Sequence, residues 1–271
     1  MIKSKSILFQ IQDLRSGYSP GNPVIELPSL DIYRDQITFI IGKSGSGKST
    51  LLETLGFMNN SFIERSKDQV TYFDRNGVAT DVGGLWSQPV SNHSNFRNAQ
   101  FSFIFQDNNL LEHFSSLENI LVPMMLNNAD MTSSLDLVKQ AFNKIHLSES
   151  LMTKNIKYLS GGQRQRVSFL RGLLADKPVL FGDEPTGNLD PVTARALMLM
   201  VRESVVSKHS SAIIVSHDLG LASTFADRII ILKAEEGSAG KVHNIFEKKE
   251  DVWIRINGTD ELVYDEMASM I

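Results

Sequence analysis

The chain has 271 residues, of which 42% are hydrophobic and 21% are charged, as is ordinary for a soluble globular protein that buries a full core. Its formal net charge of −4 argues against a general nucleic-acid-binding protein, which usually carries a basic face. Because the chain has no cysteine, it has neither a disulfide framework nor a thiolate metal site.

The sequence predicts no membrane anchor. Two lysines lie near the start, but the apolar run that follows, residues 7–9, is too short for the core of a signal peptide. The longest uninterrupted apolar run, residues 120–126, contains Pro123 and falls far short of the roughly 18 residues that a spanning helix needs. We therefore expect any work at a membrane to depend on a second chain.

The first predicted elements are strands at residues 7–14, 24–32 and 37–41, and a helix-forming run follows at residues 51–55. The phosphate-loop pattern G-x-x-x-x-G-K-[ST] is matched before that run by Gly42, Lys43, Ser44, Gly45, Ser46, Gly47, Lys48, Ser49 and Thr50.

Such a loop binds phosphate because its glycines let successive N–H groups point at one anion, and the helix that follows adds the positive end of its dipole. Lys48 would reach the β- and γ-phosphates, and the Ser49 hydroxyl would ligate Mg²⁺. The other interpretation is a simple turn, but a chain of this length matches the pattern by chance only about one time in a hundred. The sequence therefore predicts a nucleotide-binding loop.

The polar segment after this loop predicts a strand at residues 69–73 and irregular surface structure from about residue 81 to residue 98. A strand at residues 101–105 then ends at Gln106.

Two capping boxes open the next helices. Ser115 with Glu118 opens a short helix that Pro123 is expected to kink or end, and Ser160 with Gln163 opens a helix at residues 160–175. The later predicted elements are a helix after Asp190-Pro191 and strands at residues 179–181, 212–216 and 228–233. Because strands and helices alternate and the strands are apolar, the sequence predicts a largely parallel α/β sheet.

The second box contains a second potential anion site, formed by Leu159, Ser160, Gly161, Gly162 and Gln163. The simpler interpretation is a good helix cap. Glycines are poor helix formers, however, so close approach of another group explains them better. This pentapeptide resembles the signature motif of ABC-type ATPases.

Other segments resemble the same family in order and spacing. Asp183 and Glu184 resemble its Walker B acids, which implies that Asp183 holds Mg²⁺ and that Glu184 polarises the attacking water as general base. Gln106 resembles the glutamine that senses Mg²⁺ and this water, and His217 resembles the switch histidine that donates to the γ-phosphate. Without the other motifs, a pair of acidic residues after a strand is more often part of a solvated turn. A lone histidine at the end of a strand is likewise usually an ordinary surface residue.

Two further residues are assigned through this resemblance. Asp190 lies in a segment that resembles the D-loop, where it would bridge two subunits. Tyr18 lies where family members stack an aromatic ring on adenine. A core or turn tyrosine is the alternative for Tyr18, and Tyr33 is the second candidate for the adenine platform.

Residues 183–190 and 117–120 look most like the MacB/LolD group, whose ATPases drive export of lipoproteins, antibiotics and virulence factors from bacterial inner membranes. This implies ATP and Mg²⁺ as ligands, a second copy that shares two ATP molecules, and a transmembrane permease subunit with a cytoplasmic coupling helix. It places the chain at the cytoplasmic face of the inner membrane, with no nucleic acid expected. The alternatives are an importer ATPase or a soluble ABC ATPase acting on DNA or ribosomes. The soluble ATPase is disfavoured because the chain has one cassette and no heptad insertion.

The resemblance also implies the fold, a P-loop NTPase core with a mainly parallel sheet, an N-terminal antiparallel β subdomain and an inserted α-helical signature subdomain. It gives a nucleotide-binding domain at residues 1–234, with the helical subdomain at residues 107–165, and a C-terminal extension at residues 235–271. In this extension residues 242–246 and 252–256 predict a β-hairpin without an assigned role.

Six apolar residues follow the sensing glutamine closely. They either pack in the core or form an adaptable docking groove for a cytoplasmic helix of a transmembrane subunit. They are Leu110, Leu111, Phe114, Ile120, Met124 and Met125.

Overall fold

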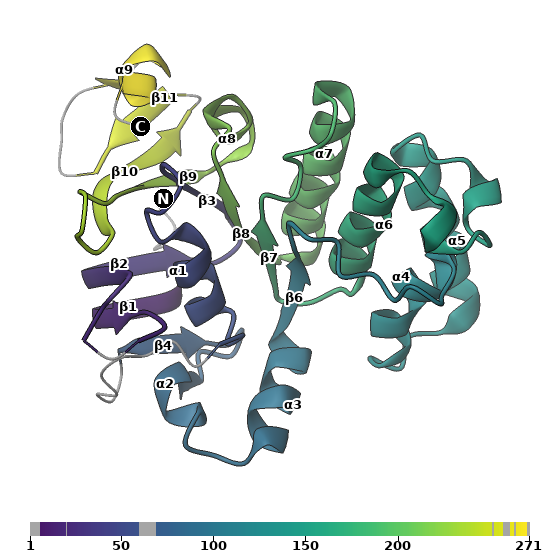
Figure 1. The fold of residues 1–271 in the computed structure, drawn as a ribbon, viewed down its shortest axis with the longest axis horizontal. Helices are drawn as coiled ribbons and strands as arrows, with labels where there is room; N and C mark the ends of the chain where they lie inside the picture. The colour runs from purple at the N-terminus through teal and green to yellow at the C-terminus, as the bar shows by residue number, and fades with distance from the viewer. Residues whose placement is uncertain are drawn as a thin grey trace.

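The computed structural model describes residues 6–19, 21–59, 69–250, 252–256, 261–262 and 264–269. Within these ranges the strands form two sheets (Figure 1). The smaller sheet is antiparallel in the order β2-β1-β4-β5 and comprises β1 (Ile7–Ser16), β2 (Ile25–Tyr33), β4 (Val70–Phe73) and β5 (Ala79–Asp81). It forms the predicted N-terminal antiparallel part.

The larger sheet has the order β12-β11-β10-β9-β3-β8-β7-β6. Its parallel strands are β3 (Ile37–Ile41), β6 (Phe101–Ile104), β7 (Val179–Asp183), β8 (Ser211–Ser216) and β9 (Arg228–Lys233). Every residue of β3 and β8 is buried, as expected for parallel strands covered on both faces. The register pairs Ile41 with Ser216 and Asp183 with Val215, so the ends of β3, β7 and β8 meet at one edge.

The remaining strands of this sheet are antiparallel and are β10 (Lys241–Lys249), β11 (Val252–Arg255) and β12 (Glu261–Leu262). Strands β10 and β11 lie where the sequence predicts a hairpin. Phe246 and Trp253 from these strands share one buried cluster with Phe39 of β3. The sheet therefore runs on past residue 234, and a separate unit at residues 235–271 stays a prediction.

Helices α1 (Lys48–Leu55), α7 (Pro191–Lys208) and α8 (Leu219–Phe225) lie beside the parallel strands, and α9 (Tyr264–Ser269) ends the described chain. Figure 1 shows α4 (Ser116–Met125), α5 (Met131–Lys144) and α6 (Gly161–Leu174) grouped away from the smaller sheet. The short turns η1 (Glu149–Leu151) and η2 (Ile156–Tyr158) lie between α5 and α6. In the described part of the chain, no helix combines the length and the hydrophobicity that a membrane crossing requires.

Both predicted capping boxes are present at the starts of α4 and α6. Pro123 does not end α4, which continues to Met125. Because Pro123 lies in the last turn, the backbone hydrogen bond that proline cannot donate is lost only near the helix end.

The prediction of irregular structure at residues 81–98 is wrong, because this segment contains α2 (Val82–Leu85) and most of α3 (Val90–Gln100). Helix α3 has no buried residue, so its sequence shows little hydrophobic periodicity. Aromatic contacts hold it in place: the ring centroid of Phe57 lies 5.5 Å from that of His93 and 6.4 Å from that of Phe96, and the Tyr72 ring lies 5.6 Å from Phe96. Tertiary packing, which a local pattern does not reveal, therefore selects this helix.

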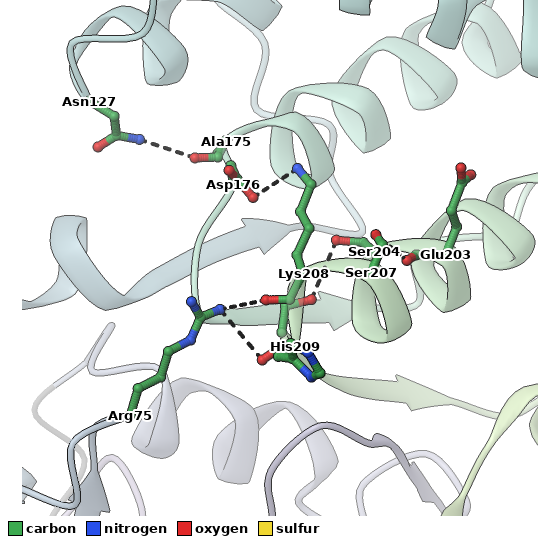
Figure 2. Close-up of polar contacts among 10 residues, drawn as sticks. Arg75, Asn127, Ala175, Asp176, Glu203, Ser204, Ser207, Lys208 and His209 are labelled. Carbon is green, nitrogen blue, oxygen red and sulfur yellow. Dashed lines mark hydrogen bonds and ion pairs between the residues drawn. The ribbon is translucent and has the colours of Figure 1, made fainter.

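Polar contacts join the parts of the molecule at the edge where the parallel strands begin (Figure 2). Arg75, after β4, donates to the carbonyl oxygens of Lys208 (2.9 Å) and His209 (3.4 Å), at the end of α7. The Lys208 ammonium pairs with Asp176 at 2.8 Å, and Asn127 donates to the carbonyl just before Asp176 at 3.1 Å. These contacts lie away from the opposite edge of the sheet, where β3, β7 and β8 end. They therefore do not cover that opposite edge.

Candidate active site

The phosphate-loop sequence connects β3 to α1 in a tight turn. Gly45 and Gly47 have φ values of +81° and +86°, which side chains other than glycine's rarely adopt. A Cβ atom at Gly47 would lie 2.4 Å from Cγ1 of Ile25, and one at Gly42 would lie 2.4 Å from the carbonyl oxygen of Leu232. The loop is therefore packed against β2 and β9 and keeps its shape through contacts that only glycine permits.

Lys48 is half-buried at the start of α1 and lies across its own loop. Its ammonium donates to the carbonyl oxygens of Gly42 (2.8 Å) and Lys43 (3.0 Å). Burial lowers the pKa of Lys48, and the carboxylates of Glu184 and Asp183 oppose that shift. A bound phosphate would offer this ammonium a stronger, charged acceptor than the two carbonyls.

Ser49 and Asp183 form a pair of oxygen ligands. The Ser49 hydroxyl donates to Oδ1 of Asp183 at 3.2 Å, and burial raises the pKa of Asp183 despite this bond. Hydroxyl and carboxylate oxygens are the hard ligands that Mg²⁺ prefers. Among the described residues, no cluster of three His, Cys, Asp or Glu side chains could hold a metal by itself. The pair therefore fits Mg²⁺ shared with substrate phosphates rather than a metal enclosed by protein.

Glu184 and His217 are in direct contact, although 33 positions separate them in the chain. Nδ1 of His217 lies 2.9 Å from Oε1 of Glu184, and Ser216 donates its hydroxyl to the other carboxylate oxygen at 3.4 Å. The backbone N–H of Glu184 also donates to the carbonyl of Val215 at 3.0 Å. Glu184 has φ +46°, an uncommon conformation for a residue other than glycine. The pairing of β7 with β8 thus holds this carboxylate against the imidazole.

A cavity of about 440 Å³ brings these groups together. Its lining includes the predicted catalytic and metal-binding residues Lys48, Ser49, Gln106, Asp183, Glu184 and His217. They come from the carboxyl ends of β3, β6, β7 and β8, which is where ligands bind in open α/β sheets.

The segment after Gln106 is tied to α6 by two residues that the sequence did not single out. Ser168 donates to the carbonyl of Asn108 at 2.8 Å, and Arg171 donates to the carbonyls of Asn108 (3.0 Å) and Asn109 (2.7 Å). These bonds join the loop after Gln106 to α6, the helix that begins at residues 160–163. Only the folded chain reveals them, because about 60 positions separate the partners.

Tyr18 lies beside α1 with 61% of its surface exposed. Its hydroxyl donates to Glu53 at 2.6 Å and lies 3.3 Å from the hydroxyl of Thr50, next to the phosphate loop. Partial burial raises the pKa of Tyr18, and the hydrogen bond to Glu53 is the second largest cause of this shift. Tyr33 is a poor alternative as an adenine platform, because the guanidinium of Arg228 lies over its ring at 4.6 Å.

The signature residues stand apart from the phosphate loop of the same chain. Ser160 caps α6 by accepting from the N–H of Gln163 at 3.3 Å, and the side-chain oxygen of Gln163 accepts from the N–H of Ser160 at 3.0 Å. Residues 159–163 do not line the cavity next to Lys48. A Cβ atom at Gly161 would meet nothing within 4 Å, so packing within this chain does not require that glycine.

Asp190 is exposed and caps α7. Its carboxylate accepts from the N–H of Thr193 at 2.9 Å, and hydrogen bonds from Thr193 lower the pKa of Asp190. This capping role involves residues of one chain alone.

Comparisons with known proteins agree with this geometry. The model of the ABC transporter family matches residues 25–187. The lipoprotein-releasing system ATP-binding protein LolD of Myxococcus xanthus is 31% identical over 211 residues, 78% of this chain and 88% of the relative. The LolD protein of Buchnera aphidicola is 37% identical over 191 residues, 70% of this chain and 78% of the relative.

Solved structures show the same fold. An ATP-binding cassette, solved as a dimer in a post-hydrolysis state with ADP and Pi, matches with a TM-score of 0.73 at 24% identity over 89% of this chain and 99% of that chain. The subunit cbiO1 of Clostridium perfringens matches with a TM-score of 0.68 at 23% identity over 88% of this chain and 87% of that chain. The family match, the relatives and the site geometry agree: this chain belongs to the ABC transporter family, as an ATP-binding and ATP-hydrolysing subunit.

Proposed function

We propose that this chain hydrolyses ATP with Glu184 as general base and thereby powers export through a separate transmembrane subunit. The contact between Glu184 and His217, in one cavity with Lys48, carries the proposal. A carboxylate held beside an imidazole next to a phosphate loop is suited to polarise water for attack on a γ-phosphate.

Each group in the cavity then has a role in phosphoryl transfer. The loop amides and Lys48 hold the phosphates, and Glu184 accepts a proton from the attacking water. Because the Glu184 carboxylate can only accept, Nδ1 of His217 is the nitrogen that donates to it. Nε2 would donate to the γ-phosphate in the imidazolium form, in which both ring nitrogens carry a proton. Ser49 and Asp183 would hold Mg²⁺, which neutralises phosphate charge when bound, and Gln106 would sense it.

We further propose that a second copy completes each ATP site with Leu159, Ser160, Gly161, Gly162 and Gln163, while its Asp190 bridges the subunits. The open space around Gly161 supports this arrangement, since another chain can approach the helix start there. The solved cassette of the same fold is a dimer with ADP and Pi, which supports the presence of a second copy.

The membrane partner that we propose is a permease whose cytoplasmic helix docks next to α4. Leu111, Phe114 and Met125 are 44%, 39% and 52% exposed, whereas Ile120 and Met124 are buried and Leu110 is half-buried. The buried side chain of Asn119 bonds both the N–H (2.7 Å) and the carbonyl (3.1 Å) of Leu111. The exposed apolar residues therefore sit on a braced loop and suit the apolar face of a helix.

The relatives named for lipoprotein release support export of the MacB/LolD kind as the finer assignment. In this assignment the chain is held peripherally at the cytoplasmic face of the inner membrane by its permease, and it needs no nucleic acid.

Two variants test the proposed chemistry. Glu184→Gln should keep ATP binding and lose at least about a hundredfold in turnover, because the amide cannot accept the proton. Lys48→Ala should instead lose affinity for ATP, since it removes the charge that holds the phosphates. Binding and Mg²⁺-dependent hydrolysis are measured on both. ATP hydrolysis by Glu184→Gln at the parental rate would refute the assignment of the base.

The same Glu184→Gln variant tests the second copy. Without hydrolysis, ATP should hold two chains together, so the mass measured by light scattering should double when ATP is added. ADP, which lacks the γ-phosphate, is the control and should leave the mass unchanged. A monomeric mass in both nucleotides would count against the shared site.

A further inference from the structure

The turn between β9 and β10 lies next to the phosphate loop. Strand β9 runs parallel to β3, with Ile231 opposite Ile41, so the segments that follow these strands leave the sheet at the same edge. Figure 1 shows the β9–β10 turn close to the start of β2, and Gly240 forms a bridge with Ile25 there. A segment far along the chain therefore reaches the proposed nucleotide site.

This turn is fixed in place by backbone contacts. The N–H of Gly240 donates to the carbonyl of Val24 at 2.8 Å, and the N–H of Glu26 donates to the carbonyl of Gly240 at 3.0 Å. A Cβ atom at Gly240 would lie 2.1 Å from the carbonyl oxygen of Ser46 in the phosphate loop, so only glycine allows this approach. The turn thus packs on the back of the loop.

The tip of the turn and Tyr18 line the same cavity, a second one of about 350 Å³. Gly237 and Ser238 line one part of it, Tyr18 and Val24 line another, and Gly45 connects it to the phosphate loop. Gly237 has φ +76°, and Ser238 donates its N–H to the carbonyl of Glu235 at 2.9 Å. The volume of this cavity falls within the range of small-ligand pockets, about 300–1,000 Å³.

We propose that Gly237 and Ser238 form the second wall of the nucleoside site, with the base and ribose of the nucleotide lying between them and Tyr18. This rests on the proposed role of Tyr18 and the phosphate loop. Gly237 presents no side chain and permits close approach. The Ser238 hydroxyl is exposed and offers both a donor and an acceptor to the polar edge of a base or to a ribose hydroxyl.

The absence of cysteine from the natural chain makes a direct test possible. In the Ser238→Cys variant, the rate of thiol alkylation is measured with ADP, with inorganic pyrophosphate and without ligand. At a ligand concentration a hundred times Kd, only about 1% of the sites are empty. We therefore expect ADP to slow alkylation at least about tenfold and pyrophosphate, which has no nucleoside, to leave the rate unchanged.

The matched control is His243→Cys. His243 is exposed on the same hairpin but does not line the cavity next to Tyr18. It lines a neighbouring cavity beside Lys43 and Lys233, which Ser238 also reaches. Its alkylation rate should be the same under all three conditions. ADP binding is measured on the same samples. A variant that does not bind ADP would count against the proposed nucleotide site, whereas a variant that binds ADP without protection would count only against the role of Gly237 and Ser238. Bound ADP without protection of the Ser238→Cys thiol, or equal protection by pyrophosphate, would overturn the proposal.

Discussion

The substitution Ser160→Ala separates the two roles that one serine can have at the start of α6. In a single chain this serine is a helix cap, with its hydroxyl 3.3 Å from the N–H of Gln163. In the proposed dimer it also donates to the γ-phosphate held by the other copy. The two roles predict different losses.

The capping role sets the loss of stability. Removing a serine cap costs about 1 kcal/mol, which lowers the melting temperature by about 2–4 °C in a domain of this size. The phosphate-binding role sets the loss of activity. Removing one donor to a developing oxyanion costs about a hundredfold in turnover. Loss of the cap alone cannot lower activity that far, because the chain stays folded at the assay temperature.

The chain contains its own matched control. Ser115 caps α4 through the same kind of box. The N–H of Glu118 donates to the Ser115 hydroxyl at 3.2 Å, and the N–H of Ser115 donates to Oε2 of Glu118 at 2.7 Å. The Ser115 hydroxyl also donates to Oε2 of Glu118 at 2.7 Å, a charge-assisted bond that alanine cannot form, so Ser115→Ala should cost at least as much stability as Ser160→Ala.

The assay compares melting temperature and basal ATPase for both variants. We expect similar decreases in melting temperature, with activity lost only in Ser160→Ala. Equal ATPase in Ser160→Ala and Ser115→Ala would refute the role of the signature serine in the shared site.

Further predictions concern docking and pH. Phe114→Glu should keep the melting temperature and basal ATPase but abolish recruitment to membranes that contain the permease. Met124→Glu should instead unfold the chain, because the side chain of Met124 is buried. Sedimentation with membranes and thermal scans distinguish these outcomes, and an unfolded Phe114→Glu variant would show that the Phe114 ring is structural. Burial raises the pKa of Asp183 above 3.8, so its charged form destabilises the ligand-free fold above the folded pKa and the penalty vanishes below pH 3.8. Asp183→Asn should therefore raise the melting temperature at pH 7 and not at pH 3, and it should lose any thermal shift caused by Mg²⁺ with nucleotide. An unchanged melting temperature at pH 7 would contradict the burial argument.

The sequence by itself determined the features that depend on near neighbours. The phosphate loop requires glycines within a few positions of Lys48, and the two capping boxes join residues three apart. The bounds of β9 match the predicted strand at residues 228–233, because an apolar β-branched run is itself the signal of a buried strand. Such patterns carry their own hydrogen bonds or their own burial, so they can be identified without knowing the fold.

Tertiary structure decided the features in which distant segments meet. Helix α3 is mostly polar, and contacts with distant residues fix it, among them the ring of Phe57 against Phe96 and the bond from Arg97 to the carbonyl of Phe57. The guanidinium of Arg228 covers the ring of Tyr33 from a strand far along the chain, which favours Tyr18 as the proposed adenine platform. Likewise, the turn that carries Gly237 and Ser238 lies beside the phosphate loop only because β9 pairs with β3. No local pattern encodes these contacts, since their free energy comes from burial and pairing between segments that the fold alone brings together.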